Sequence, residues 1–208
     1  MKTTAILLAA GTLVLGACAG TMNKDECRTV DWRTVGYEDG VAGRPGDRIG
    51  QHRKACAAAG VTPDLDAYRA GRDDGLREYC QPYNGYRAGS NGAAYYDTCP
   101  ADLEPAFVAA YESGRELYVR ERRVADADAG IANRRHELQR LEDNAARTAF
   151  QVLSDSATVE ERAQALLDAR QIAERMGRLK AEIAALEKDR ARYVQELENY
   201  RLTADSLS

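Results

Sequence analysis

The sequence predicts an all-α protein in which a small disulfide-bridged helical domain is followed by a long antiparallel coiled-coil hairpin. Strand patterns are nearly absent, because no run of alternating Val, Ile or Thr occurs and the tyrosines keep helical spacing. Twelve of the seventeen glycines and all five prolines lie between residues 25 and 118, which indicates short helices joined by turns. From residue 106 onward the chain has no proline and is rich in Ala, Arg, Glu and Leu, which is typical of long helices.

Residues 1–17 have the pattern of a secretory signal peptide. A short positive segment precedes a ten-residue apolar region at residues 5–14, which is too short to span a bilayer as a stable helix. The next four residues, Leu15-Gly16-Ala17-Cys18, resemble the lipobox of bacterial lipoproteins. This resemblance implies cleavage before Cys18 and attachment of two or three acyl chains, which anchor a protein durably at about 0.8 kcal/mol per buried methylene. The alternative is an ordinary signal peptide with a chance cysteine near its cleavage site.

The residue after the cysteine bears on the location of the anchored protein. Ala19 stands where the sorting rule of enteric bacteria requires Asp for retention at the inner membrane, so the rule implies the outer membrane. We therefore expect a signal peptide at 1–17, a lipidated N-terminus and linker at 18–26, a glycine- and tyrosine-rich helical domain at 27–118, and the coiled-coil hairpin at 119–208.

Four cysteines are left once Cys18 is assigned to the lipid, and an exported protein is in a compartment where disulfides persist. Four cysteines allow three connectivities. We favour Cys27–Cys56 and Cys80–Cys99, because nearest-neighbour pairing closes two short loops, and a loop such as the second adds roughly 3 kcal/mol of stability. The alternative is a structural zinc site, but no Cys-x2-Cys occurs and His52 is the only histidine nearby, so we expect no metal.

Residues 68–80 combine spaced glycines, tyrosines and a cysteine in one predicted helix. Tyr68, Gly71, Gly75 and Tyr79 fall on one face, at steps of three, four and four residues. Each glycine costs a helix interior about 1 kcal/mol relative to alanine, so this packing notch predicts close contact with another element. The alternative is that Gly71 or Gly75 simply ends a short helix.

A resemblance to a known family emerges from the order of these motifs. Asp31-Trp32, Tyr68-x2-Gly71, Tyr79-Cys80 and Cys99-Pro100 occur in the order found in a family of outer-membrane lipoproteins of Gram-negative bacteria, known only as a domain of unknown function. The resemblance covers about residues 25–118. It implies that the helical, exported and cysteine-bridged features belong together, and it supplies no activity or catalytic residue.

Two heptad runs follow. In the first, apolar or small residues recur every seven positions from Leu117 to Val152, and the second alternates steps of three and four from Ala169 to Tyr200, with a polar break at Arg190. Residues 154–158 lack the pattern, and Thr158 begins a capping-box sequence that ends at Glu161. We therefore expect the chain to turn at 154–158, which places Leu138 near Met176 and Ile131 near Ile183. The alternative is a hairpin that only covers the N-terminal domain, which its length argues against.

Composition excludes several classes of function. The net charge of −4 argues against a nucleic-acid binder, and no serine, cysteine or histidine stands in a nucleophile motif, so we expect neither an enzyme nor a cofactor. His136 and the pair Asp73-Asp74 fit solvated helix faces better than a catalytic site.

Three functions stay open. The first is a lipid-anchored, periplasm-facing interaction or scaffold protein that self-associates or binds a helical partner through residues 119–208. The second is a binding module for peptidoglycan or another glycan that uses the tyrosine-rich domain. The least supported is an enzyme that uses the carboxylates of Asp39, Asp73 and Asp74, of which the pair Asp73-Asp74 is the best candidate.

Overall fold

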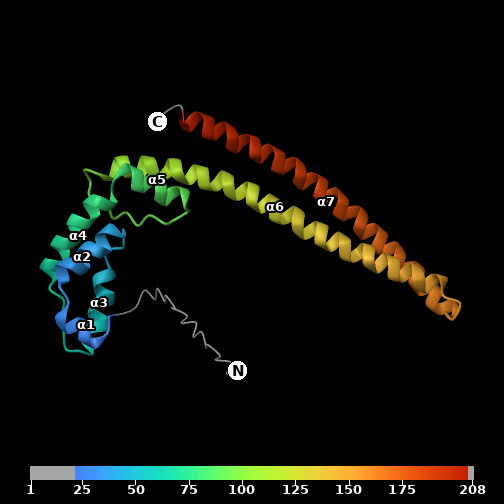
Figure 1. The fold of residues 1–208 in the computed structure, drawn as a ribbon, viewed down its shortest axis with the longest axis horizontal. Coiled ribbons are helices and arrows are strands. Elements are labelled where there is room, and N and C mark those ends of the chain that lie inside the picture. The colour runs from blue at the N-terminus through green and yellow to red at the C-terminus, as the bar shows by residue number, and fades with distance from the viewer. Residues whose placement is uncertain (1–21, 206–208) are drawn as a thin grey trace, which may run out of the picture. The chain divides into compact units, whose positions relative to one another are not determined.

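A computed structural model of the chain describes residues 22–205, and Figure 1 shows its fold. Every regular element in this range is an α-helix, which confirms the predicted fold class. The chain divides into two compact units. Of the described residues, the first unit contains those up to Tyr79 together with Tyr96–Pro100, and the second contains Cys80–Tyr95 and those from Ala101 onward. The expected signal peptide at 1–17 and the lipidation site Cys18 lie outside the described residues.

The first unit is built from α1 (Lys24–Thr29), α2 (Trp32–Val41), α3 (Arg48–Ala57) and α4 (Leu65–Tyr79). Side-chain caps set the start of two helices: Asn23 forms a capping box with Glu26 at α1, and Asp31 accepts a hydrogen bond from the backbone N–H of Arg33 at α2. The disulfide expected between Cys27 and Cys56 is present and joins α1 to α3. It lies in a core formed by Cys27, Trp32, Val35, Cys56 and Tyr68.

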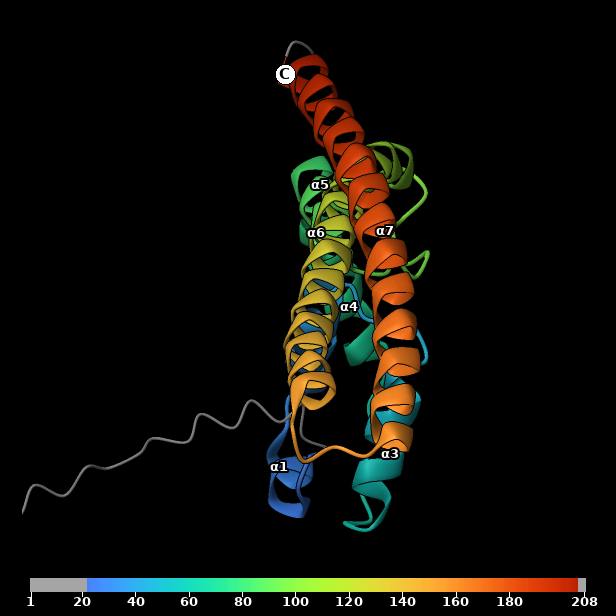
Figure 2. The same cartoon turned by 90° about the vertical axis from the view of Figure 1, so that its right-hand side faces the viewer.

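The second unit contains α5 (Pro82–Ser90), α6 (Glu104–Leu153) and α7 (Val159–Asp205). The two long helices run antiparallel, side by side, and form the predicted hairpin (Figures 1 and 2). At about 1.5 Å per residue, each arm is about 70 Å long. Cys80 and Cys99 are also disulfide-bonded, so all four cysteines in the described range are oxidised.

The hairpin turns at residues 154–158, as the break in the heptad pattern predicts, and Figure 2 shows the connecting loop. Thr158 and Glu161 form the expected capping box: the backbone N–H of Thr158 donates to the Glu161 carboxylate at 2.8 Å, and the backbone N–H of Glu161 donates to the Thr158 hydroxyl at 3.2 Å. Ion pairs between the arms, Arg175 with Glu137 and Arg134 with Glu182, agree with the expected register.

The seam between the arms is narrow. Ile131, Ile172, Leu179, Ile183 and Leu197 are buried, but Met176, Leu186 and Tyr193 are only half-buried. Arg190, the predicted polar break, is exposed and pairs with Asp128 of the other arm at 2.5 Å. Two helices alone therefore bury only a thin strip of apolar surface.

The expected domain boundary at 118/119 falls inside α6, which runs without a break from Glu104 to Leu153. The division into compact units instead separates Tyr79 from Cys80 and assigns α5 to the same unit as the hairpin. The physical reason is that Gly114 does not end the helix. It allows the backbone of α5 to approach α6, and after Pro105 in the first turn no further proline interrupts the helix.

Candidate functional site

In the first unit, α2 and α4 cross backbone against backbone at four glycines, Gly36, Gly40, Gly71 and Gly75. A Cβ atom at Gly71 would overlap the carbonyl oxygen of Arg33, and one at Gly36 would overlap that of Tyr68. Each helix thus presents glycines to carbonyl groups of the other. We call this contact the first glycine crossing. The structure places Gly71 and Gly75 at its centre, where the helical face predicted from the sequence meets α2.

The second unit repeats this arrangement where α5 crosses the start of α6. A Cβ atom at Gly85, Gly89 or Gly114 would overlap the carbonyl oxygen of Phe107, Tyr111 or Tyr86, respectively. We call this contact the second glycine crossing. The same helix-packing solution is therefore used twice, once in each unit.

The two crossings share a sequence signature, Gly-Tyr-x2-Gly-x2-Gly, at residues 36–43 and 85–92. The third glycine of each copy follows the helix with positive φ, 60° at Gly43 and 70° at Gly92. A tyrosine ring from the crossing helix packs on it, Tyr79 on Gly43 and Tyr118 on Gly92, and leaves no space for a side chain. Residues 31–118 therefore contain an internal repeat of a glycine-crossed helix pair.

One feature of the first pair is missing from the second. The buried carboxylate of Asp39 on α2 accepts hydrogen bonds at 2.8 Å from the Tyr68 hydroxyl of α4 and from Nε2 of His52 on α3. The Arg48 guanidinium lies 3.7 Å from the same carboxylate. The signature aligns Asp39 with Ala88, and the aromatic position of Tyr68 corresponds to Phe107, where the rings of Tyr95 and Phe107 pack at 5.0 Å. The polar cluster is therefore not a requirement of the crossing itself.

The ionisation of this cluster follows from its surroundings. Burial alone would raise the pKa of Asp39, but the hydrogen bonds from His52 and Tyr68 outweigh it, and the pKa lies below its ordinary value. Burial and the hydrogen bond to Asp39 raise the pKa of Tyr68 well above that of a free tyrosine. Asp39 is thus an ionised acceptor and Tyr68 a neutral donor, an arrangement that ties α2, α3 and α4 together and offers no accessible nucleophile.

The other carboxylates considered from the sequence lie on the surface. Asp74 forms an exposed ion pair with Arg33 at 2.6 Å, and Asp73 and His136 are exposed. Within residues 22–205, no group of three or more Cys, His, Asp or Glu side chains is arranged to hold a metal ion. None of the described helices is long and apolar enough to cross a bilayer.

The end of the hairpin beside the turn carries a feature that the heptad pattern did not predict. Five large apolar side chains are largely exposed there: Phe150 (77%), Leu153 (80%), Val159 (79%), Leu166 (59%) and Leu167 (56%). They fall off the heptad seam, so a search for periodicity passes over them. Their clustering on both sides of the turn is the sequence signal that would have revealed them. Exposed apolar groups gathered in one place mark an interaction site more often than scattered ones do.

The described part of the chain is thus an all-α protein with two glycine-crossed helix pairs, bonded cysteines and a long hairpin. Residues 31–116 match the model of a family described as a protein of unknown function (DUF2799), which confirms the resemblance expected from the sequence. The matched segment includes both glycine crossings. Comparisons with curated proteins and with solved structures gave no match.

Proposed function

We propose that this protein is a lipoprotein of the cell envelope, anchored in the outer membrane through Cys18, that acts as a periplasm-facing interaction or scaffold protein through its coiled coil. The observation that carries the proposal is the exposed apolar surface beside the hairpin turn. A solvated surface of this kind is unfavourable unless a partner covers it. By contrast, the buried polar groups of the first unit bond to one another and hold its helices together.

The lipobox-like sequence supports the anchor. Only four residues lie between Cys18 and Asn23, the cap of α1. A chain of this length spans at most about 18 Å, so a lipid at Cys18 would hold the first unit close to the membrane surface. The hairpin, at about 70 Å, is about four times as long as this linker. The anchor and the hairpin therefore suit a protein that binds a second component of the envelope.

The anchor is tested by changing Cys18→Ala and fractionating cells. We expect loss of lipid-dependent processing and release from the membrane fraction, because no other acylation site resembles the lipobox. A variant that is processed normally and stays with the outer membrane would contradict the anchor.

The interaction surface is tested by placing a photo-crosslinking amino acid at position 153 in cells. Position 202 is the matched control, because Leu202 is exposed to a similar degree (71%) near the other end of α7. We expect a discrete crosslinked species from position 153 and none from position 202. Equal labelling at both positions, or none at 153, would contradict a binding site beside the turn.

A second candidate function is glycan binding, and α5 provides the observation that favours it. Tyr83 and Tyr86 are three residues apart on this helix and are exposed, as rings that stack on sugars must be. The test is sedimentation of the protein with purified peptidoglycan. Retention that is lost in a Tyr83→Ala, Tyr86→Ala variant would support this function over the scaffold. The other tyrosines of the crossings have packing roles, since Tyr68 is buried and Tyr79 and Tyr118 cover glycines.

A further inference from the structure

We infer that α5 carries a binding surface for a glycan with carboxylate groups, on which the rings of Tyr83 and Tyr86 stack on sugars and the guanidinium of Arg87 pairs with a carboxylate. The inference rests on glycan binding, the second candidate function above. It specifies the charge of the ligand and the residue that recognises this charge, and it is independent of the surface beside the hairpin turn.

The three side chains share one face of α5. At about 100° per residue, Tyr83, Tyr86 and Arg87 fall within an arc of about 100°. All three are exposed, Tyr83 at 72% and Tyr86 at 38%. Gly85 and Gly89 lie on the other side of the helix, which packs on the start of α6 (Figure 1). The second glycine crossing therefore leaves the face of Tyr83, Tyr86 and Arg87 uncovered, and we call it the α5 face.

The internal repeat offers a comparison for the α5 face. The alignment of residues 36–43 with 85–92 gives the first copy Thr34, Tyr37 and Glu38 where the second has Tyr83, Tyr86 and Arg87. These three residues of the first copy are exposed too. Their hydroxyls are bonded, however, because Thr34 donates to Asp31 and Tyr37 donates to Glu78, each at 2.8 Å. The counterpart of the α5 face thus keeps its hydroxyl groups paired within the first unit.

The acceptor of the first copy has no counterpart in the second. Tyr79 and Tyr118 occupy equivalent places, since each ring packs on the third glycine of its copy. The residue before them is Glu78 in the first copy and Leu117 in the second. A leucine side chain cannot accept a hydrogen bond, so the second copy does not tie its exposed tyrosine to the neighbouring helix in this way.

The α5 face therefore presents two rings with free polar ends. Within residues 22–205, neither the Tyr83 nor the Tyr86 hydroxyl has a hydrogen-bond partner in the protein. The rings stand three residues apart, with about 5–6 Å between their Cβ atoms, and each can stack on a sugar. Their hydroxyls can donate to and accept from sugar hydroxyls. α5 contains no Leu, Ile, Val, Met or Phe, the residues that a docked partner helix would need.

Arg87 adds a positive charge to this face. Its guanidinium lies 5.8 Å from the centre of the Tyr83 ring, and in the described part of the chain it belongs to no ion pair. By contrast, Arg120 and Arg192, which also lie over tyrosine rings, pair with carboxylates. Arg87 is thus available to a carboxylate of a ligand, which a guanidinium can bind through two parallel hydrogen bonds.

The first copy has the opposite charge at the corresponding positions. It carries Glu38 where α5 has Arg87, and Glu78 where α6 has Leu117. These carboxylates would repel an anionic ligand. A glycan with carboxylates should therefore bind at the α5 face and not at its counterpart, which makes the first copy a control within the same chain.

Peptidoglycan has the chemistry that the α5 face requires. It joins sugar rings to peptide stems that carry carboxylates, and it lies in the periplasm, which the proposed lipid anchor faces. Lipopolysaccharide is the other source of charged sugars at the outer membrane, and it carries phosphates. It occupies the outer leaflet, away from the periplasm, so we assign the surface to peptidoglycan.

The test uses the full chain with Cys18→Ser, which avoids detergent. A pelleting assay compares three insoluble probes: purified peptidoglycan, the same peptidoglycan with its carboxylates converted to neutral amides, and chitin, an uncharged polymer of N-acetylglucosamine. The protein left in solution gives each dissociation constant at low and raised salt. We expect the tightest binding to untreated peptidoglycan, and this affinity should fall as salt rises, because screening weakens the contact with Arg87.

Variants locate the site. Arg87→Gln should raise the dissociation constant for untreated peptidoglycan about tenfold or more, the cost of losing a hydrogen bond between charged groups, and should leave binding to the amidated form unchanged. Arg69→Gln is the matched control for charge, because Arg69 is exposed on a helix of the first unit. Tyr86→Ala should weaken binding to all three probes, whereas Tyr37→Ala, at the equivalent position of the first copy, should not. All these side chains are exposed, so the fold should be kept, and circular dichroism checks this.

Two results would overturn the role of the carboxylate and retain glycan binding: equal affinity for untreated and amidated peptidoglycan, or equal weakening by Arg87→Gln and Arg69→Gln. Stronger binding to lipopolysaccharide, with the same loss in Arg87→Gln, would make phosphates the ligand instead. Equal loss in Tyr37→Ala and Tyr86→Ala would remove the α5 face as the site. No binding to any of the three probes would remove glycan binding itself and leave the scaffold function untouched.

Discussion

Replacing Gly71 with alanine tests the first glycine crossing directly, because a Cβ atom there would overlap the carbonyl oxygen of Arg33. That oxygen belongs to the backbone of α2, so no side-chain rotation relieves the overlap. Overpacking of this kind costs typically about 1–3 kcal/mol. The higher helix propensity of alanine would return about 1 kcal/mol.

The overlap is not confined to one position. If α4 moves away from α2, the close contacts at Gly36, Gly40 and Gly75 are weakened as well, because all lie on the same crossing. The cost therefore belongs at the upper end of the overpacking range or above it. We expect a net loss of about 2 kcal/mol in the free energy of unfolding of the first unit.

The assay is urea denaturation followed by the fluorescence of Trp32, which is the single tryptophan of the chain and is buried in the core of the first unit. With a slope of about 2 kcal/mol per molar urea, the loss should lower the midpoint by about 1 M. Gly50→Ala is the matched control, since Gly50 lies in α3 of the same unit and a Cβ atom there would meet nothing within 4 Å.

The control should be as stable as the wild type or slightly more stable, because only helix propensity changes. A Gly71→Ala protein that behaves like Gly50→Ala would refute the close backbone packing of α2 and α4. It would leave Gly71 as an ordinary helix glycine with no packing role.

The buried carboxylate of Asp39 predicts a loss of stability in acid. Its pKa in the folded protein is lowered, so its contribution is complete above about pH 4, near the unfolded pKa of about 3.9, and is lost as pH falls further. Asp39→Asn should lower the urea midpoint at pH 7 and flatten the decline between about pH 4 and pH 3; an unchanged decline would assign it to other carboxylates. Tyr68→Phe should cost about 1.5 kcal/mol by removing a hydrogen bond to a charged group, and a neutral result would make that bond dispensable. Reduction of Cys27–Cys56 should lower the midpoint by the equivalent of about 3 kcal/mol, and peptide mapping without reduction should find Cys80 and Cys99 oxidised, whereas free thiols at either would contradict their bonded state.

The hairpin was predictable because its signals are local. Heptads identify the two arms, and a break in the pattern with the Thr158–Glu161 capping box locates the turn. The start of the first arm was not predictable in the same way. In the sequence, Gly114 is typical of a break in a helix. In the structure, the carbonyl group of Tyr86 packs against Gly114, so the glycine serves close packing and α6 continues through it.

The internal repeat was not recognised from the sequence, because an identical four-residue motif occurs at two positions that are not equivalent in the structure. Tyr-Arg-Ala-Gly occurs at 68–71 and at 86–89, and the identity suggests that these segments are equivalent. In the structure, the second segment instead corresponds to residues 37–40, because both belong to the helix that ends in a glycine with positive φ. Identity over four residues is weaker evidence of equivalence than a shared turn and a shared packing partner.

The polar cluster could not be predicted from spacing. Asp39, His52 and Tyr68 come from three helices, and nothing in the local sequence shows that their side chains meet. The exposed apolar residues beside the turn were overlooked for a different reason, since a heptad analysis gives weight to residues on the seam. Phe150 and Leu153 are informative because they are large, apolar and off that seam.

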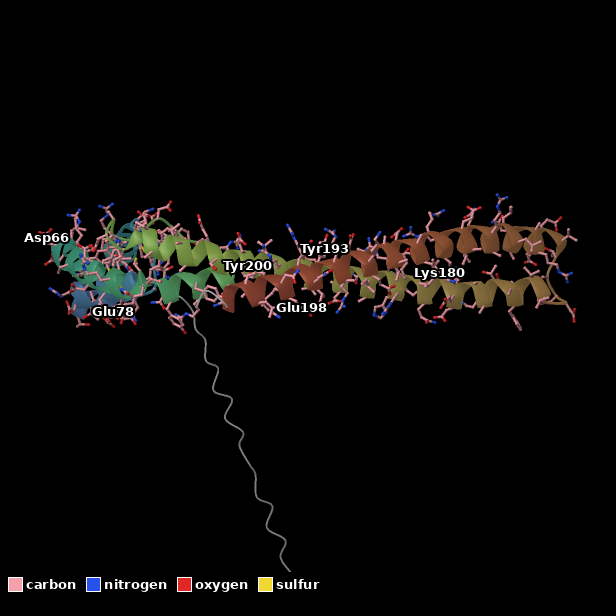
Figure 3. All side chains as sticks on the ribbon, turned by 90° about the horizontal axis from the view of Figure 1, so that it is seen from above. Asp66, Glu78, Lys180, Tyr193, Glu198 and Tyr200 are labelled. Atoms are coloured by element: carbon pink, nitrogen blue, oxygen red, sulfur yellow. A yellow bond between two sulfur atoms is a disulfide. The ribbon has the colours of Figure 1, made fainter. Side chains whose placement is uncertain are left out.

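The continuity of α6 determines how the hairpin is connected to residues 31–116, the segment that matches the family model. The face of Gly114 packs on α5, and the adjacent Ser113 accepts a hydrogen bond from the Tyr200 hydroxyl at 2.6 Å through its carbonyl oxygen. The Arg120 guanidinium lies 4.4 Å from the centre of the Tyr200 ring, and Figure 3 shows Tyr200 near the end of α7. Within about two turns, α6 therefore contacts both α5 and the end of α7. A flexible linker at this point would let the hairpin move freely relative to α5, whereas the continuous α6 holds the base of the hairpin against both α5 and the end of α7.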